Sequence, residues 1–247
     1  MSDGPREDLD QAVEVVNAQG QGGVLILCEH ASNAMPERYE GLGLSEEVRV
    51  SHAAWDPGAR DLAVVLSAAL DSPLVAGRVS RLVYDCNRPP ESETAMPARS
   101  EVFDIPGNAG LDAAERAERT EAVYVPFCAA VDAQVAQARA LVTVHSFTPL
   151  WHGTPRETEI GILHDTDSRL ADAMLTRAPQ GRAVHRNRPY GPEDGVTHSL
   201  KLHALSRGLP NVMIEVRNDL LTTPEDIQTV AAELLAMLSP ALEAMDA

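Results

Sequence analysis

The stretch Gly23-Val24-Leu25-Ile26-Leu27-Cys28 is a short apolar run that ends abruptly in the small and polar residues Glu29-His30-Ala31-Ser32-Asn33. A continuous run of this kind is typical of a strand that is buried on both faces, as in a parallel sheet. In open α/β sheets, ligands bind outside the carboxyl ends of the strands. We therefore expect a strand over residues 23–28 that delivers His30 to such a site.

The rest of the chain alternates between further strand-like runs and helical patterns. Strands are expected at residues 74–76, 82–84, 140–144, 159–163, 182–185 and 211–216. Helices are expected at residues 9–16, 59–70, 111–138, 168–177, 197–207 and 224–245. This alternation favours a three-layer α/β sandwich, in which helices flank a mixed, largely parallel sheet. Because no repeat or linker divides the sequence, we expect one domain over residues 1–247, with residues 1–22 as a lead-in segment.

Composition excludes several classes of function. The chain has a formal net charge of −17 and no basic run, whereas nucleic-acid-binding proteins need positive patches. No apolar run approaches the roughly 20 residues that span a membrane, and the acidic N-terminus lacks the pattern of a signal peptide. Three cysteines without a CxxC pair suit a reducing compartment. We expect a cytoplasmic protein that binds neither nucleic acid nor membrane; the residues predict no oligomeric state.

Polar residues at the ends of three expected strands form a candidate metal site. His30, His145 and Glu215 come from distant parts of the sequence and would meet at one rim of the sheet. Catalytic zinc takes three protein ligands from His, Asp, Glu or Cys and keeps one position for water. His30 and His145 are the natural pair, and Asp56 is the first choice for the third ligand. Glu29 is the alternative, although neighbours along a strand point to opposite faces.

Glu215 lies inside an apolar strand, where a carboxylate is costly unless it is paired or used. It is a candidate general base whose pKa is set by burial and by the metal. An ion pair with Arg217 or another arginine is the alternative interpretation. Both interpretations remain open at this point.

Arginines and an asparagine near the expected site are candidates for substrate binding. An arginine can bind a carboxylate in a bidentate fork, which lysine does not reproduce. Arg81, Arg88 and Arg217 could hold substrate carboxylates, and Asn87 could donate to substrate oxygens. A structural ion pair, for example with Asp85, is the alternative for Arg81 and Arg88.

Five segments with polar or catalytic residue types follow one another along the chain. They are residues 29–33, 56–58, 80–89, 145–149 and 214–217. In this order they resemble the N-formylglutamate amidohydrolase family, over about residues 23–238. The arginine-asparagine segment (residues 80–89) and the His-Ser-Phe-Thr-Pro segment (residues 145–149) are the most specific parts of the resemblance.

The resemblance implies a zinc-carboxypeptidase-like fold and hydrolysis of an N-formyl or N-acyl amide of an acidic amino acid, such as N-formyl-L-glutamate. It implies zinc, or another divalent metal, at His30 and His145, and a catalytic role for Glu215. The related carboxypeptidases and aspartoacylases use a His-x-x-Glu pair, but this sequence has Asn33 in place of that glutamate. The departure favours Asp56 as the third ligand, and Asn33 becomes a candidate for contact with the substrate.

Two other classes of function stay open. A binding protein on the same fold could hold an acidic metabolite through its arginines without catalysis, although the intact set of His30, His145 and Glu215 argues against it. A cysteine hydrolase could use Cys28 or Cys86 with a histidine. Cys28 lies inside an apolar run, however, which favours an inert thiol.

Overall fold

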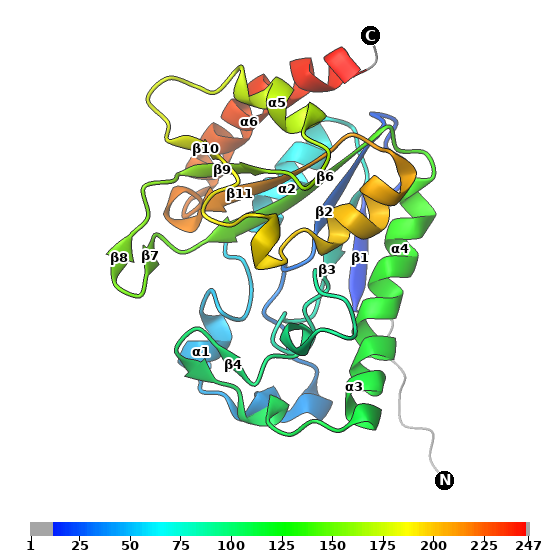
Figure 1. The fold of residues 1–247 in the computed structure, drawn as a ribbon, viewed down its shortest axis with the longest axis vertical. Coiled ribbons are helices and arrows are strands. Elements are labelled where there is room, and N and C mark those ends of the chain that lie inside the picture. Colours follow the sequence, from blue (N-terminus) through cyan, green and yellow to red (C-terminus); the bar gives the residue numbers. More distant parts are fainter. Residues whose placement is uncertain (1–11, 246–247) are drawn as a thin grey trace.

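The computed structural model describes residues 12–245, and most of its strands belong to one sheet (Figure 1). The sheet has seven strands in the order β1-β3-β2-β6-β11-β9-β10. They are β1 (Val13–Val16), β2 (Val24–Cys28), β3 (Leu74–Gly77), β6 (Ala140–Phe147), β9 (Ile160–Leu163), β10 (Val184–Arg186) and β11 (Asn211–Arg217). Strands β3, β2, β6 and β11 are parallel, whereas β1 and the β9–β10 pair run in the opposite direction. The mixed, largely parallel sheet is confirmed.

Helices cover both faces of this sheet and complete the three layers. One core packs beneath α2 (Ala59–Ala69), α5 (Arg169–Leu175) and α6 (Pro224–Met245), and the opposite core packs beneath α4 (Val125–Val135). Because side chains alternate along a strand, Ile26 of β2 faces the first core while Leu25 and Leu27 face the second. Every residue of β2 is buried, which explains its unbroken apolar sequence.

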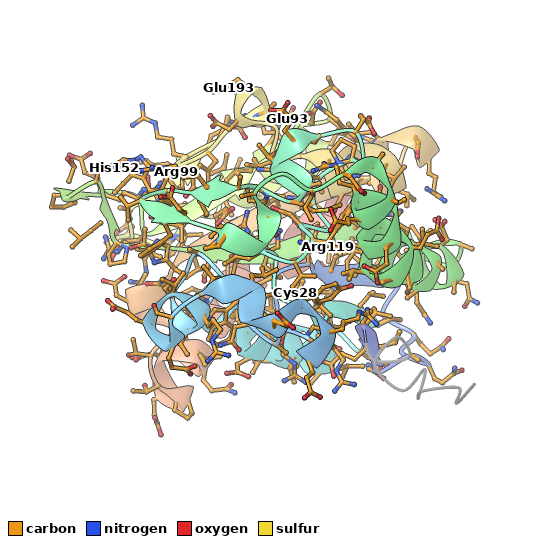
Figure 2. The ribbon with its side chains drawn as sticks, turned by 90° about the horizontal axis from the view of Figure 1, so that it is seen from below. Cys28, Glu93, Arg99, Arg119, His152 and Glu193 are labelled. Atoms are coloured by element: carbon orange, nitrogen blue, oxygen red, sulfur yellow. The ribbon has the colours of Figure 1, made fainter. Side chains whose placement is uncertain are left out.

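Short elements connect these layers, and several of them lie above the carboxyl ends of the central strands. They are η2 (Glu37–Gly43), α1 (Glu46–Val50), η3 (Glu93–Ala95), β4 (Arg99–Ser100), β5 (Phe103–Asp104), η4 (Pro106–Asn108), α3 (Ala113–Arg119), η5 (Thr120–Tyr124), β7 (Leu150–Trp151), β8 (Thr154–Pro155), η6 (Pro192–Asp194), η7 (Leu200–Ala204), η8 (Leu205–Arg207) and η9 (Asn218–Leu220). The β7–β8 hairpin, with His152 at its tip, projects from the edge of the molecule (Figure 1, Figure 2).

Two local predictions are wrong. Residues 13–16, predicted as helix, form the edge strand β1, because the valine-rich segment pairs antiparallel with the open edge of β3. Residues 82–84, predicted as a strand, lie in turns, where the Val83 N–H donates to the Ser80 carbonyl. Their apolar side chains are buried in the second core, and this burial produces the strand-like sequence. Residues 9–11 lie outside the described residues.

Two predicted helices differ in detail from regular α-helices. The stretch at residues 111–138 is divided into α3, the π-helical segment η5 and α4, with Pro126 in the first turn of α4. The stretch at residues 197–207 contains the π-helical segment η7 and the 3-10 segment η8.

The parallel register brings distant residues together at one rim of the sheet. Strands β6 and β11 pair so that Glu215 lies opposite His145. The single domain stays a prediction, although strands drawn from residues 13 to 217 share one sheet. Among residues 12–245, no helix combines the length and apolar character of a membrane span.

Candidate metal centre and active site

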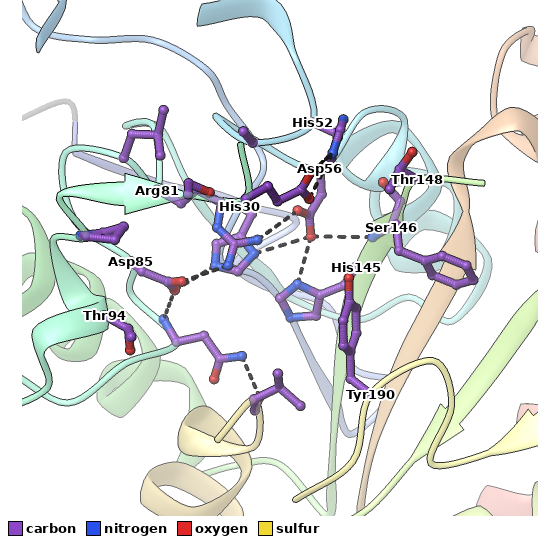
Figure 3. Close-up of a pocket in the computed structure, with 18 of the residues that line it drawn as sticks. His30, His52, Asp56, Arg81, Asp85, Thr94, His145, Ser146, Thr148 and Tyr190 are labelled. Carbon is purple, nitrogen blue, oxygen red and sulfur yellow. Dashed lines mark hydrogen bonds and ion pairs between the residues drawn. The ribbon is translucent and has the colours of Figure 1, made fainter. Parts of the chain in front are cut away.

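His30, Asp56 and His145 form a buried cluster at this rim (Figure 3). Their ligand atoms all lie within 4.8 Å of one another. Both imidazoles turn Nδ1 toward Asp56 Oδ2, at 3.3 Å for His30 and 2.9 Å for His145. The structure therefore brings together the three residues predicted as metal ligands.

The segment before α2 delivers Asp56 to the two histidines. The Asp56 N–H donates to the His30 carbonyl at 3.0 Å, which ties this segment to the end of β2. Gly58 precedes α2 with a φ of 78°, in the left-handed region. A Cβ at Gly58 would lie 2.5 Å from the Leu221 Cβ, so the close approach of Leu221 to the start of α2 requires glycine.

The second ring nitrogen of each histidine faces another buried carboxylate. His30 Nε2 lies 2.7 Å from Asp85 Oδ1, and His145 Nε2 lies 3.2 Å from Glu29 Oε2. Such partners orient an imidazole and favour the tautomer whose opposite nitrogen is free for a metal. Glu29, the alternative third ligand, thus lies behind His145, outside the cluster. Two Nδ1 atoms and a carboxylate oxygen are a donor set that suits catalytic zinc, so the residues fit a divalent metal.

The carboxylates and imidazoles of the cluster shift one another's pKa values toward the charged forms. Burial would lower the pKa of His145, but the Glu29 and Asp56 carboxylates outweigh burial and raise that pKa well above its ordinary value. Burial would raise the pKa of Asp56, but the two imidazoles lower it. Asp56 is therefore ionised and available as a ligand at neutral pH.

Glu215 lies beside the cluster with part of its carboxyl group unpartnered. It is buried, and among residues 12–245 its Oε2 has no hydrogen-bond partner. Burial raises the pKa of Glu215 to about 7. Among residues 12–245 Glu215 forms no ion pair with Arg217 or with another arginine, and Arg217 instead contacts Asp219 through Nε at 2.8 Å. A carboxyl group with a pKa near neutrality is suited to accept and return a proton.

A cavity of about 390 Å³ opens over these residues. All but two of the site residues predicted from the sequence line it: His30, Asp56, Arg81, Asn87, Arg88, His145 and Glu215. Asn33 lies off the cavity and donates from Nδ2 to the Arg49 carbonyl at 3.1 Å. Arg217 also lies off the cavity.

Three arginines line the cavity and differ in their partners, and Arg99 pairs with Asp104 at 3.1 Å. Arg81 is held by two carboxylates, with Nη2 at 2.8 Å from Asp85 Oδ2 and Nη1 at 3.4 Å from Asp56 Oδ1. Arg88 donates to the Asn87 carbonyl at 2.8 Å and, within residues 12–245, pairs with no carboxylate. The Asn87 side chain bonds to the backbone at Val196 and Ser199. Arg88 is therefore the guanidinium whose charge is available to a bound carboxylate.

Comparison with known proteins agrees with this geometry. A family model described as N-formylglutamate amidohydrolase matches residues 22–222. The chain belongs to the N-formylglutamate amidohydrolase family. No curated protein matches the chain.

Solved structures extend the family comparison. The gene product Atu2144 from Agrobacterium tumefaciens is 54% identical, with a TM-score of 0.94 and 98% of each chain covered. The N-formylglutamate amidohydrolase from Ralstonia eutropha JMP134 is 18% identical, with a TM-score of 0.69 and coverage of 96% of this chain and 98% of that one, so it shares the fold. A metallo-carboxypeptidase from Burkholderia cenocepacia is more distant, with 13% identity, a TM-score of 0.38 and coverage of 97% and 67%.

Asp85 and Tyr190 belong to the site but are not singled out by the sequence. Asp85 was expected only as an ion-pair partner of an arginine, and its contact with His30 depends on how the turn at residues 80–88 folds. Tyr190 lines the cavity from the loop after β10, and its sequence neighbourhood carries no strand or helix pattern. An acidic residue between two arginines was the one available signal for Asp85.

The thiols do not form a catalytic site. Cys28 and Cys86 are buried, and neither lines the cavity. Burial raises the pKa of both thiols well above the ordinary value. Because the thiolate is the nucleophile, this environment argues against the cysteine-hydrolase alternative.

Proposed function

We propose that the protein is a metal-dependent amidohydrolase that removes a formyl or other acyl group from an acidic amino acid. Membership of the N-formylglutamate amidohydrolase family supports amidohydrolase activity. The observation that carries the proposal is that a buried His-Asp-His cluster and Glu215, whose Oε2 has no hydrogen-bond partner among residues 12–245, line the same cavity. N-formyl-L-glutamate is the reference substrate.

His30 Nδ1, His145 Nδ1 and an Asp56 oxygen would hold the metal, for which zinc is the first choice. A bound divalent cation would supply Lewis acidity, which polarises a carbonyl group and lowers the pKa of a water molecule. Asp85 and Glu29 would hold the imidazole rings in the orientation that this requires.

Glu215 is the proposed proton carrier. Its ionised carboxylate removes a proton from the attacking water, whose oxygen forms a bond to the acyl carbon. The protonated carboxyl group then delivers that proton to the nitrogen as the C–N bond breaks. The products are a carboxylic acid, which is formate for a formyl substrate, and the free amino acid.

The arginines would bind and orient the substrate. Arg88 would pair with a substrate carboxylate, because no carboxylate of residues 12–245 occupies it. Arg81 keeps N–H groups beyond those bonded to Asp56 and Asp85, and these could stabilise negative charge on the carbonyl oxygen. The positive charge of Arg88 would also offset locally part of the net charge of −17.

The experiment that tests this function joins metal analysis to a hydrolysis screen. The purified protein is assayed against N-formyl and N-acyl derivatives of glutamate, aspartate and leucine, before and after chelation and after zinc is restored. We expect release of formate from N-formyl-L-glutamate that is lost on chelation and recovered with zinc. Hydrolysis that persists undiminished without metal, or no hydrolysis of any member of the screen, would contradict the proposal.

The cytoplasmic location of the protein stays a prediction.

A further inference from the structure

We propose that Arg156 is a positioning residue that orders one wall of the cavity and leaves the hydroxyl group of Tyr190 free to donate to a bound substrate. Arg156 follows β8 and does not itself line the cavity. Its effect is therefore transmitted through the residues that it touches. The kinetic part of this inference rests on the proposed function, whereas the ordering of the wall does not.

One guanidinium contacts three aromatic rings from separate segments. The Arg156 Cζ lies 5.3 Å from the ring centre of Phe147, 4.8 Å from that of Trp151 and 4.9 Å from that of Tyr190. All three aromatic residues line the cavity. They belong to the end of β6, to β7 and to the loop after β10. A cation within about 6 Å of an aromatic face attracts it, so Arg156 joins these three segments.

Hydrogen bonds fasten the same arginine to the wall. Nη2 donates to the Tyr190 Oη at 3.0 Å, and Nη1 donates to the Thr148 carbonyl at 3.4 Å. The Arg156 N–H donates to the Pro149 carbonyl at 2.9 Å. Among residues 12–245, no carboxylate pairs with Arg156, in contrast to Arg182, which pairs with two glutamates. The interactions of the Arg156 guanidinium are therefore with the cavity wall.

Tyr190 accepts from Arg156 and keeps its own donor. A phenol group carries one donor hydrogen, and no acceptor for it lies within the described part of the chain. Burial and then Glu215 raise the pKa of Tyr190, so the phenol stays protonated at neutral pH. The hydroxyl group can therefore donate to an oxygen atom of a substrate in the cavity.

Strand β9 also constrains the path of the loop that carries Tyr190. A Cβ at Gly161 of β9 would lie only 2.0 Å from the Arg188 carbonyl oxygen, so the loop packs directly on the strand. Arg156 then fixes the position of the ring at the end of this loop. Lysine could not replace it, because an ammonium group lacks the planar fork that stacks on rings and donates to two acceptors at once.

The test combines Arg156→Lys, Tyr190→Phe and the double variant, with Arg177→Lys as the control. Arg177 lies off the cavity and donates to the Ala173 carbonyl. The kinetic probe is N-formyl-L-glutamate, with bound metal measured in parallel. A second readout is acrylamide quenching of Trp151 in a Trp55→Phe background, since the chain has two tryptophans.

We expect each single variant to lose about tenfold in kcat/KM with unchanged metal content, the size of effect expected when a charge-assisted hydrogen bond is lost. The double variant should lose no more than Tyr190→Phe alone, because Arg156 acts on the substrate through the Tyr190 hydroxyl group. Trp151 should become more accessible to acrylamide in Arg156→Lys and not in the control.

Multiplied kinetic losses in the double variant, or unchanged quenching in Arg156→Lys, would overturn the inference. If the wild-type protein hydrolyses no N-formyl amino acid, the proposed function fails. The quenching result still decides whether Arg156 orders the wall.

Discussion

The rim of the sheet and the loops above it hold their polar side chains in different ways. At the rim, His145 and Glu215 are buried and are fixed by the parallel register of β6 and β11. In the loops, Arg88 and Tyr190 are partly exposed, and each is held by contacts with other loop residues. A rigid rim suits bond making and breaking, which requires fixed geometry, whereas loops suit the choice of substrate. Substitutions at the rim should therefore change turnover or metal binding, and substitutions in the loops should change KM.

The largest expected effect is at the rim itself. His30→Ala or His145→Ala removes a metal ligand, and kcat should fall at least about 1,000-fold as several kcal/mol of transition-state stabilisation are lost. Bound metal should fall below one equivalent, as measured by elemental analysis. His185→Ala, which alters a histidine off the cavity, is the control. Full metal content in both rim variants would remove the proposed centre.

A second effect at the rim is a dependence of stability on pH in the metal-free protein. Burial raises the pKa of Glu215 from 4.5 to about 7. Below both values the carboxyl group is protonated in the folded and unfolded chains, and no stability is lost. As pH rises from about 4.5 to 7, only the unfolded chain ionises, so the folded state loses stability, on the order of 3 kcal/mol above pH 7.

Glu215→Gln should remove this penalty, so the variant becomes progressively more stable than the wild-type protein as pH rises from 5 to 8. Urea unfolding of both metal-free proteins at several pH values measures the difference. A difference that stays constant over this range would show that Glu215 does not titrate there.

Arg88 tests the loop side of the comparison. Arg88→Ala should raise KM for N-formyl-L-glutamate about 50-fold, because a charge-assisted contact with a carboxylate is lost. The KM for a neutral N-formyl amide should change little, and this substrate serves as the control. Steady-state kinetics with both substrates gives the answer; equal increases would argue against a contact with a carboxylate.

The smallest expected effect is on metal affinity, when Asp85, the carboxylate that contacts His30, is substituted. Asp85→Asn should weaken metal binding about tenfold, the low end for partners of ligating histidines, because the amide still offers an acceptor oxygen. Competition with a chromophoric chelator measures the affinity. Asp165→Asn, which alters an acid paired with Lys201, is the control. An unchanged affinity in Asp85→Asn would mean that Asp85 does not orient His30.

The sequence predicts strands and site residues best where a fully buried strand is followed directly by polar residues. Strands β2 and β6 are buried on both faces, so their composition shows them directly, and the next polar residues fall at the rim. Edge strand β1 has a mixed burial pattern, and its pairing with β3 could not be read from its own residues. The turn at residues 82–84 is as buried as a strand, and burial without pairing misled the prediction.

The same contrast between strands and loops holds for the residues of the site. His30, His145 and Glu215 could be predicted because each follows or ends a recognisable strand. The contacts of Arg156 and Tyr190 depend on how two loops pass over the sheet, and no local pattern encodes those paths. From the sequence, loop residues are therefore at most candidates for substrate binding, and only the structure shows which residues they contact.

The most direct test of the central claim is the kinetic comparison of metal-loaded wild-type protein and Glu215→Gln. Turnover of N-formyl-L-glutamate should fall by about 100- to 10,000-fold, the range for removal of a general base. Metal content should stay equal to that of the wild-type protein, since Glu215 lies outside the His30–Asp56–His145 cluster. Near-normal turnover in a fully metal-loaded variant would contradict the account.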